Sequence, residues 1–224
     1  MKRSVALQTG KSRSARRRTS GGREAGSRDR LFAAAAKEFA ARGFAGANVD
    51  RIAGDARVNK AMIYYHFGSK AALYREIVGD MFRAVAGRVR DVAASTAPAR
   101  DKLQHFIAAI ATEAEARPHF PPIWFREIAE GGVHLDGATL REIAGIVQML
   151  ARILDQGVKQ RQFRRVNPML VHGGIIAPLL LFFASGPVRE RLRRAGVPGI
   201  ADMKREQVVA HVQRVTLDLV EGRT

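Results

Sequence analysis

One stretch of the chain, NVDRIAGDARVNKAMIYYHFGSK at residues 48–70, constrains the fold more than any other part of the sequence. Its apolar residues follow two short helical periods with a break between them. Ile52 and Ala56 lie four residues apart, as do Ile63 and Phe67, so each pair marks one buried helical face. The pattern predicts two short helices joined by a tight turn, which is a helix-turn-helix.

Polar residues stand where these helices begin and end. Asn48 and Asn59 precede the two helices and are good N-cap residues, because the Asn side chain accepts a hydrogen bond from the first turn. Gly68 ends the second helix, and Ser69 can cap a third helix whose first turn holds Lys70. The second helix is therefore the predicted recognition helix for a DNA major groove.

The second helix leaves Lys60, Ala61, Tyr64 and Tyr65 on its outward edge. Lysine donates to guanine or phosphate oxygens, and tyrosine offers a hydroxyl group and a flat ring that contacts sugars or a thymine methyl group. These residues are the predicted DNA contacts. Two alternatives stay open, because Tyr64 can instead close the small core of the three-helix unit and His66 can cap the helix end.

The sequence from Arg28 to Leu73 resembles the DNA-binding domain of the tetracycline-repressor (TetR) family. The segments LFAAAAKEFAARGF, VDRIAGDA, VNKAMIYYHF and SKAAL carry the resemblance. It implies an all-α protein with an N-terminal three-helix helix-turn-helix DNA-binding domain and a larger helical ligand-binding and dimerisation domain. It also implies a homodimer that binds a pseudo-palindromic DNA operator and responds to a small-molecule effector, with repression favoured because blocking a promoter needs no contact with polymerase.

The resemblance adds to the predicted DNA-binding residues. Positions that match Tyr65 and His66 bind phosphate in the family, and Lys70 matches a lysine that starts the next helix. Arg57 stands where the family usually has Gly, so the turn either avoids a positive φ angle or is strained, and Arg57 adds a possible phosphate contact. The predicted DNA-binding residues are Asn48, Arg57, Asn59, Lys60, Ala61, Tyr64, Tyr65, His66 and Lys70.

Basic residues are concentrated at the N-terminus of a chain whose formal net charge is +17. Residues 1–30 hold ten Lys or Arg residues against Glu24 and Asp29. This composition predicts a disordered basic arm over residues 1–27 that follows phosphates or enters a minor groove. The predicted domains are the arm at 1–27, the DNA-binding domain at 28–74, and the effector-binding and dimerisation domain at 75–224.

The chain has no cysteine, which excludes disulfides and thiolate metal sites and favours a cytoplasmic protein. No secretory signal is predicted, because the first apolar segment is short and arginines follow it. The longest apolar run, residues 169–184, is shorter than the roughly 20 residues that span a bilayer and contains His172 and Pro178. It predicts a buried helix and no membrane contact.

Beyond Lys70 the sequence has helical periodicity and no strand-like alternation. The first helix of this part crosses the boundary between the two predicted domains, so it is the expected lever between effector and DNA. The predicted helices lie at residues 69–94, 100–116, 121–130, 138–160, 168–185 and 202–221.

An apolar stripe on the last predicted helix needs a partner helix, because its members recur every three or four residues. The stripe alone favours a core within one chain, whereas the resemblance favours a subunit interface that includes the run 168–185. The predicted dimer-interface residues are Ile175, Leu179, Val208, Val212, Val215 and Leu219.

Aromatic residues in the second domain are candidates for an effector pocket, although such residues at helical spacing are more often ordinary core. Their character favours an apolar or aromatic small molecule, with Arg126, Glu127 or His172 as polar anchors. The predicted lining residues are Phe106, Phe120, Trp124, Phe125, Met149, His172 and Phe182.

Two other classes of function compete with a regulator. No catalytic residue or cofactor is predicted, because the sequence has no Ser/His/Asp order, phosphate-binding glycine loop or HExxH zinc helix. No metal site is predicted either, and His134 with Asp136 is the weak exception. The alternative is a non-specific basic DNA-coating protein, since charge alone binds any duplex. The helix-turn-helix and the large helical domain favour a sequence-specific regulator.

Overall fold

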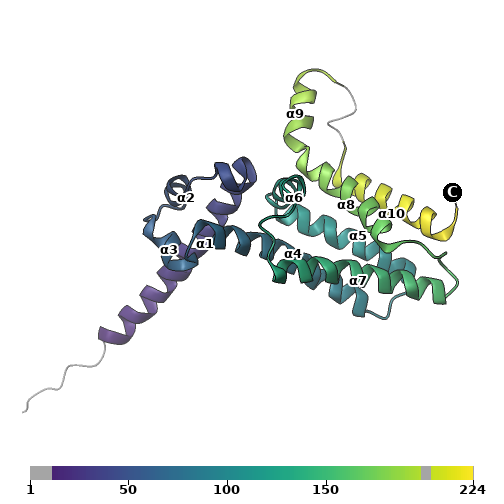
Figure 1. Ribbon diagram of the computed structural model, residues 1–224, viewed down its shortest axis with the longest axis horizontal. Helices are drawn as coiled ribbons and strands as arrows, with labels where there is room; N and C mark the ends of the chain where they lie inside the picture. The colour runs from purple at the N-terminus through teal and green to yellow at the C-terminus, as the bar shows by residue number, and fades with distance from the viewer. Residues whose placement is uncertain (1–11, 198–202, 224) are drawn as a thin grey trace, which may run out of the picture. The chain divides into compact units, whose positions relative to one another are not determined.

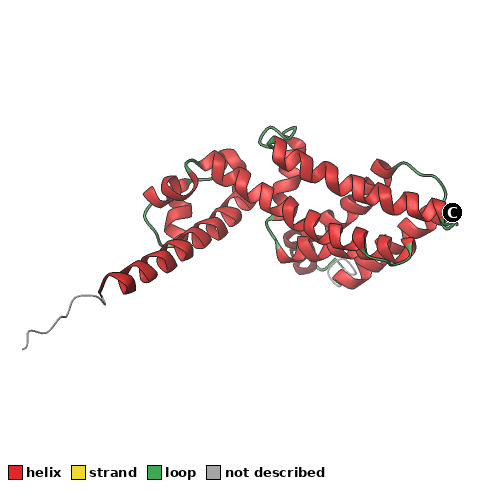
Figure 2. Ribbon diagram, turned by 90° about the horizontal axis from the view of Figure 1, so that it is seen from below, coloured by secondary structure: helices red, strands yellow, loops and turns green. Residues whose placement is uncertain are grey.

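The computed structural model describes residues 12–197 and 203–223, with the backbone alone for residues 12–25. These ranges contain ten helices and no strand (Figures 1 and 2). The all-α fold predicted from the sequence is therefore confirmed. The chain divides into two compact units, Met1–Tyr74 and Arg75–Thr224, and the boundary lies inside one long helix, α4 (Lys70–Ala94).

The first unit consists of α1 (Ser12–Gly46), α2 (Val49–Ala56), α3 (Ala61–Phe67) and the first turn of α4. Helix α1 packs against both α2 and α3, and α2 packs against α3. The apolar residues that the sequence assigned to inward faces fill the space between these helices. Each large apolar side chain removed from water stabilises the folded unit by roughly 1.5–3 kcal/mol. The buried residues of this small core include Leu31, Ala35, Phe39, Ile52, Ala53, Ala56, Ile63 and Phe67.

Helix α1 is interrupted near its C-terminal end by Gly43. The φ of 69° and ψ of 178° at this residue lie in a region that glycine alone adopts freely. The break redirects the chain so that the Phe44 ring lies against two other rings of the first unit. Its centroid is 6.3 Å from that of Phe39 and 5.3 Å from that of Tyr74. Gly43 thus allows the aromatic core that closes the unit beside the start of α4.

Helix α1 begins earlier than the sequence predicts. Residues 12–27 are helical, so the predicted disordered arm is wrong for them, and residues 1–11 lie outside the described residues. A packed helix extends at low cost, because each added residue forms a hydrogen bond without repeating the entropy loss of the first turn. Arg and Ala, which recur here, are also strong helix formers.

The second unit contains the rest of α4 and six further helices. The predicted spans agree with six of these seven helices to within three residues at each end. Helix α9, which begins at Gly186 and Pro187, lies between the last two predicted spans and was not predicted. Proline is favourable in the first turn of a helix, where its missing N–H is not needed. The added helices are α5 (Ala99–Ala116), α6 (Phe120–Ala129), α7 (Gly137–Lys159), α8 (Pro168–Ala184), α9 (Gly186–Arg194) and α10 (Arg205–Glu221).

Helix α5 lies at the centre of the second unit. It packs against α7, α8 and α10, and Figure 1 shows α5, α8 and α10 side by side. Leu103, Phe106, Ile107 and Ile110 of α5 are each 0% exposed, because successive faces of the helix meet different neighbours. This core sets the positions of α8 and α10 in the second unit.

An ion-pair network joins α4 to α5. Glu113 is 4% exposed and accepts hydrogen bonds from Arg88, at 2.5 Å, and from Arg117. Arg117 also donates to Asp80 of α4, at 3.1 Å. A carboxylate removed from water is tolerated when guanidinium groups surround it. The network therefore fixes how far α4 and α5 are displaced from each other along their axes.

No single helix in residues 12–197 and 203–223 is long and apolar enough to cross a membrane. Helices α8 and α9 together have the length and composition, but they meet at a bend of 53°. Val171, Ile175, Leu179 and Leu180 of α8 are buried against the rest of the second unit.

Candidate nucleic-acid interface and effector cavity

The helices of the helix-turn-helix begin at the capping residues predicted from the sequence. The Asn48 side chain accepts a hydrogen bond from the backbone N–H two residues on, at 2.7 Å, and Asn59 does the same at 2.8 Å. Ser69 Oγ accepts from the N–H three residues on, at 3.0 Å, and so starts α4. These caps use backbone donors that otherwise lack a partner, and they determine where α3 begins relative to α2.

The turn between α2 and α3 adopts a left-handed conformation at Arg57, with φ 54° and ψ 47°. The Arg57 N–H donates to the carbonyl of Gly54 at 3.0 Å, which closes the end of α2. Arg30 of α1 donates through Nε to the carbonyl of Ala56 at 3.1 Å and caps the same helix end. The turn therefore does not avoid the positive φ angle, and Arg57 carries the strain that a side chain meets there.

We expect Arg57→Gly to raise the free energy of unfolding by roughly 0.5–1 kcal/mol, because glycine removes the left-handed strain while costing some unfolded-state entropy. Urea denaturation measures the change, and Arg57→Ala, which keeps the strain, is the matched control. A decrease in stability for the glycine variant would contradict the strain argument. Equal losses of DNA affinity in both variants would assign a DNA contact to the Arg57 side chain.

The outward edge of α3 is open to solvent. Tyr64 is 49% exposed and Tyr65 is 69% exposed, while Ile63 and Phe67 fill the core beneath them. Tyr64 therefore does not close the core, which was the alternative interpretation. Tyrosine is enriched at interfaces because it joins an apolar ring to a polar hydroxyl group, and the rings and hydroxyl groups of Tyr64 and Tyr65 are available to bases and sugars.

Lys60 is held at the start of α3 by Asp50 of α2, with 2.9 Å between Nζ and Oδ1. The hydrogen bond from Lys60 to Asp50 raises the pKa of the lysine, so its ammonium group stays charged. Both groups are exposed, and water screens such a pair. The lysine is thus placed beside the tyrosines and remains able to exchange Asp50 for a phosphate or a guanine.

His66 joins α3 to α1, since its Nε2 lies 2.8 Å from Ser27 Oγ and its ring meets Tyr65 edge-on with centroids 5.0 Å apart. This contact replaces the alternative in which His66 caps the helix end. Lys70 begins α4, and its Nζ lies 4.8 Å from the centroid of the Phe44 ring. The aromatic face holds the ammonium group near the N-terminus of α4, where helix N–H groups favour anions.

Glu38 is a site residue that the sequence pattern did not indicate. It is 8% exposed, and its carboxylate accepts from the N–H of Asn48 at 3.1 Å and lies 2.6 Å from Arg51 and 3.3 Å from Arg42. Burial raises the pKa of Glu38, but the hydrogen bonds from Arg51 and Asn48 outweigh it, and the pKa lies below its ordinary value. This carboxylate ties α1 to the beginning of α2, and its position depends on tertiary packing.

The predicted effector residues do not gather in one cavity. Phe106 is 0% exposed and Phe120 is 3% exposed, so both belong to the core. Trp124 packs edge-on against Phe82, with centroids 4.9 Å apart. Met149 lines a small cavity of about 180 Å³. Core aromatics and ligand-facing aromatics share the same helical spacing, which is why the sequence did not separate them.

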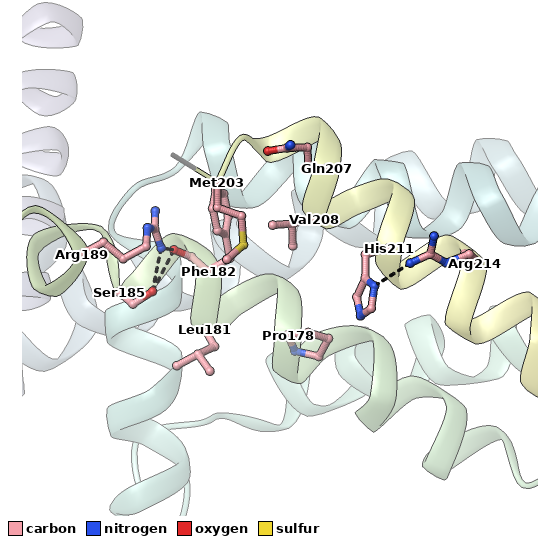
Figure 3. A pocket seen from close by; sticks show the side chains of 10 residues that line it. All are labelled: Pro178, Leu181, Phe182, Ser185, Arg189, Met203, Gln207, Val208, His211 and Arg214. Carbon is pink, nitrogen blue, oxygen red and sulfur yellow. Dashed lines mark hydrogen bonds between the residues drawn. The ribbon is translucent and has the colours of Figure 1, made fainter. Parts of the chain in front are cut away.

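A larger cavity, of about 750 Å³, lies among α8, α9 and the start of α10 (Figure 3). Phe182 is the predicted effector residue that lines it, with Leu181 and Met203 as further apolar walls. Figure 3 shows Arg189 at one end and Arg214 at the other. The Arg189 guanidinium stacks on the Phe182 ring, 4.2 Å from its centroid, and donates to the hydroxyl of a neighbouring serine at 2.7 Å.

His172 and Phe125 do not line the larger cavity. Both are partly buried. Burial lowers the pKa of His172, which keeps its ring neutral near pH 7. No described contact joins His172 or Phe125 to Phe182 or Arg189. The polar groups of the cavity therefore include Arg189 and Arg214 and not the predicted His172.

The predicted dimer interface is partly wrong. Ile175 and Leu179 are 0% exposed, Val212 is 2% exposed and Val208 is 8% exposed, because the chain itself covers them. Val215 and Leu219 remain exposed. The inner faces of α8 and α10 pack together, so the stripe recognised in the sequence largely serves the core. The outer face of α8 instead exposes Leu170 and Leu181 with small residues between them at Gly173, Gly174 and Ala177.

A helix-turn-helix of two capped helices, α2 and α3, with an open edge on α3 that bears two tyrosines, defines a DNA-binding protein, here continued by a larger helical unit.

Comparison with known proteins agrees with this class. A family model described as bacterial regulatory proteins of the tetR family matches residues 31–77. The HTH-type transcriptional repressor SCO4008 of Streptomyces coelicolor is 34% identical over 103 residues, or 46% of this chain and 50% of that protein. The HTH-type transcriptional repressor NicS of Pseudomonas putida is 27% identical over 158 residues, or 70% of this chain and 74% of that protein.

The fold extends the similarity along the chain. PfmR from Thermus thermophilus, a TetR family transcriptional regulator, superposes with a TM-score of 0.64 at 24% identity, over 84% of this chain and 97% of that one. The match to SCO4008 spans half of that protein's length. Residues 31–77 thus carry a DNA-binding domain similar to that of the tetR family of bacterial regulatory proteins, and the similarity to two transcriptional repressors supports a DNA-binding transcriptional regulator. The alternative of a non-specific DNA-coating protein has no support among these relatives.

Proposed function

We propose that the protein is a ligand-responsive transcriptional repressor that binds a pseudo-palindromic operator as a homodimer in the cytoplasm, without enzymatic activity. The exposed edge of α3, with Lys60, Tyr64 and Tyr65 on a capped and packed helix-turn-helix, is the observation that carries this proposal. The names of SCO4008 and NicS, both repressors, support repression over activation.

In this proposal the side chains on the outward edge of α3 contact the base edges and determine which DNA sequence is bound. Lys60 and Tyr64 are four residues apart and lie on one side of the helix, so both reach the same groove. A good side-chain contact to a base edge is worth about 1–3 kcal/mol. Lys70 and the N–H groups at the start of α4 serve the phosphate backbone, which sets the register of α3 without reading sequence.

Homodimerisation is proposed for the outer face of α8, with Val215 of the adjacent α10. Leu170 and Leu181 are 75% and 60% exposed, and Val215 is 51% exposed. Small residues at Gly174 and Ala177 would let a symmetry-related α8 approach closely. A two-fold axis at this face presents two copies of α3 to two half-sites of an inverted repeat.

The proposed effector is a small molecule with an apolar or aromatic body and an acidic group. The cavity of about 750 Å³ has the size of known ligand sites, and Phe182, Leu181 and Met203 give it apolar walls. Among the described residues that line it there is no Asp or Glu, whereas Arg189 and Arg214 supply two guanidinium groups. Such a site favours a carboxylate paired with an apolar body.

Effector and DNA are linked in this proposal through the subunit interface. Leu181 lines the cavity and also belongs to the exposed face of α8. A ligand that binds better to one packing of this face than to another shifts the dimer toward that packing. The spacing of the two α3 helices then changes, and operator affinity falls.

The test of sequence-specific binding is selection from a pool of the source genome's DNA fragments at roughly 0.15 M salt, where non-specific attraction is screened. An enriched inverted repeat is the expected result. Lys60→Ala and Tyr64→Ala should each weaken binding to that repeat about tenfold or more, whereas Lys159→Ala on α7 should not. Uniform retention of all fragments would reject a sequence-specific regulator.

The effector class is tested by release of the protein from the selected repeat. Aromatic and straight-chain carboxylic acids should release it, and their uncharged amides should not. Arg189→Met keeps apolar bulk and removes the charge, so it should abolish release by acids while leaving DNA binding intact. Equal release by acids and amides would reject the acidic group, and no release by any compound would reject this cavity as the effector site.

A further inference from the structure

We infer a binding site for a divalent transition-metal ion at the C-terminal end of α6, formed by Glu127, Glu130 and His134. One donor atom from each of these residues lies within 4.8 Å of the other two. His134 Nδ1 is 3.0 Å from Glu127 Oε1 and 3.8 Å from Glu130 Oε2. The sequence predicted no metal site and paired His134 with Asp136, whereas Asp136 caps α7 by accepting from the backbone N–H of Thr139 at 2.8 Å.

The fold brings the three side chains together in two steps. Glu127 and Glu130 are three residues apart and therefore lie on one side of α6. The chain then reverses, and the N–H of Gly132 donates to the carbonyl of Glu127 at 2.7 Å. This reversal returns His134 over the carboxylate of Glu127.

Burial favours a cation among these groups. The side chain of Glu127 is 0% exposed, that of His134 is 20% exposed, and that of Glu130 is 45% exposed. A carboxylate away from water is tolerated when positive charge stands beside it, and a divalent ion bound here would supply such charge. The gradient of exposure leaves the Glu130 side as the entry path for an ion.

The donor set indicates which ions fit. One imidazole nitrogen with two carboxylates suits Zn²⁺, Co²⁺, Ni²⁺ or Mn²⁺, whereas Mg²⁺ and Ca²⁺ prefer oxygen ligands alone. Zinc bonds of about 2.0–2.1 Å at tetrahedral angles place two donor atoms about 3.3 Å apart. The distances of 3.0 and 3.8 Å bracket that separation, and Glu130 is exposed enough to rotate onto an ion. Three protein ligands leave a coordination position for water or an anion.

A bound ion would hold the segment between α6 and α7. That segment ends at Asp136, whose carboxylate accepts a hydrogen bond from the backbone N–H of Thr139 in the first turn of α7. Thr139 is 3% exposed, so the first turn of α7 is packed inside the second unit. A bound ion would therefore stabilise a segment whose C-terminal end is already held by the packed first turn of α7.

The test uses the full-length protein after dialysis against EDTA. Titration with Zn²⁺ in a calorimeter should show one equivalent bound per chain, and Co²⁺ should give visible ligand-field bands that Zn²⁺ displaces. Mg²⁺ should do neither. Zn²⁺ should also raise the melting temperature, because it binds the folded chain. DNA and effector are absent from these measurements, so their outcome is independent of the proposed regulatory function.

Glu130→Gln removes one donor at a partly exposed position and should weaken Zn²⁺ binding at least tenfold. Glu206→Gln, the same change on α10, is the matched control and should bind as the parent does. His134→Gln should lose the Co²⁺ bands. Absence of stoichiometric binding, or binding that survives both Glu130→Gln and His134→Gln, would overturn the proposed site.

Discussion

Phe163→Ala is expected to lower the free energy of unfolding by roughly 3–5 kcal/mol, the range for removing a large buried ring. Phe163 is 6% exposed and lies against the last turns of α7. Its N–H donates to the carbonyl of Gly157 at 3.2 Å, so ring and helix are held together at the backbone as well. The ring rests where any side chain on residue 157 would stand.

The matching variant is Gly157→Ala, which places a methyl group in that position. A Cβ atom on Gly157 would lie 1.9 Å from Cδ2 of Phe163. The ring must move, and forced overpacking costs about 1–3 kcal/mol, against a gain of up to about 1 kcal/mol in helix propensity. The double variant should cost no more than Phe163→Ala alone, because the methyl group then enters the space that the ring has left.

Urea denaturation at one protein concentration measures all three variants. Gly145→Ala on the same helix is the control, since no heavy atom lies within 4 Å of a Cβ built there. It should stabilise the protein by up to about 1 kcal/mol. A Gly157→Ala variant as stable as Gly145→Ala would show that Phe163 does not occupy the position described.

Ala177→Arg is expected to separate the two subunits of the proposed homodimer and to weaken binding to the proposed operator by about 100-fold or more. Ala177 is exposed on α8 between Gly174 and Leu181, where the proposed two-fold interface has its small residues. A guanidinium group there would be buried twice, once from each subunit, and unpaired buried charge costs several kcal/mol. A monomer also loses the gain from binding two half-sites at once, which is on the order of 100-fold or more.

Analytical ultracentrifugation and operator titration at roughly 0.15 M salt check this expectation together. Ala144→Arg makes the same change at an exposed position of α7 and should alter neither measurement. A stable dimer in Ala177→Arg would place the interface on another face. A monomer that still binds the operator with parental affinity would reject the role of dimerisation in DNA binding.

The helix-turn-helix was predictable because its determinants are local. Asn48, Asn59 and Ser69 cap helices through hydrogen bonds that reach two or three residues, and Ile52, Ile63 and Phe67 show their faces by spacing alone. Even the departure at Arg57 was visible in the sequence as a choice between two conformations. The structure selects the left-handed one.

Other features depended on which helix faces the chain itself covers. The stripe on α10 was correctly recognised as apolar, yet Val208 and Val212 pack inward while Val215 stays exposed. The residues of the cavity beside Phe182, the carboxylate of Glu38 between two arginines, and the cluster of Glu127, Glu130 and His134 are likewise set by packing between elements. The spacing of apolar residues indicates which face of a helix is apolar, but several arrangements of the helices can bury the same face. Contacts between residues distant in sequence select one of them, and those contacts define the sites.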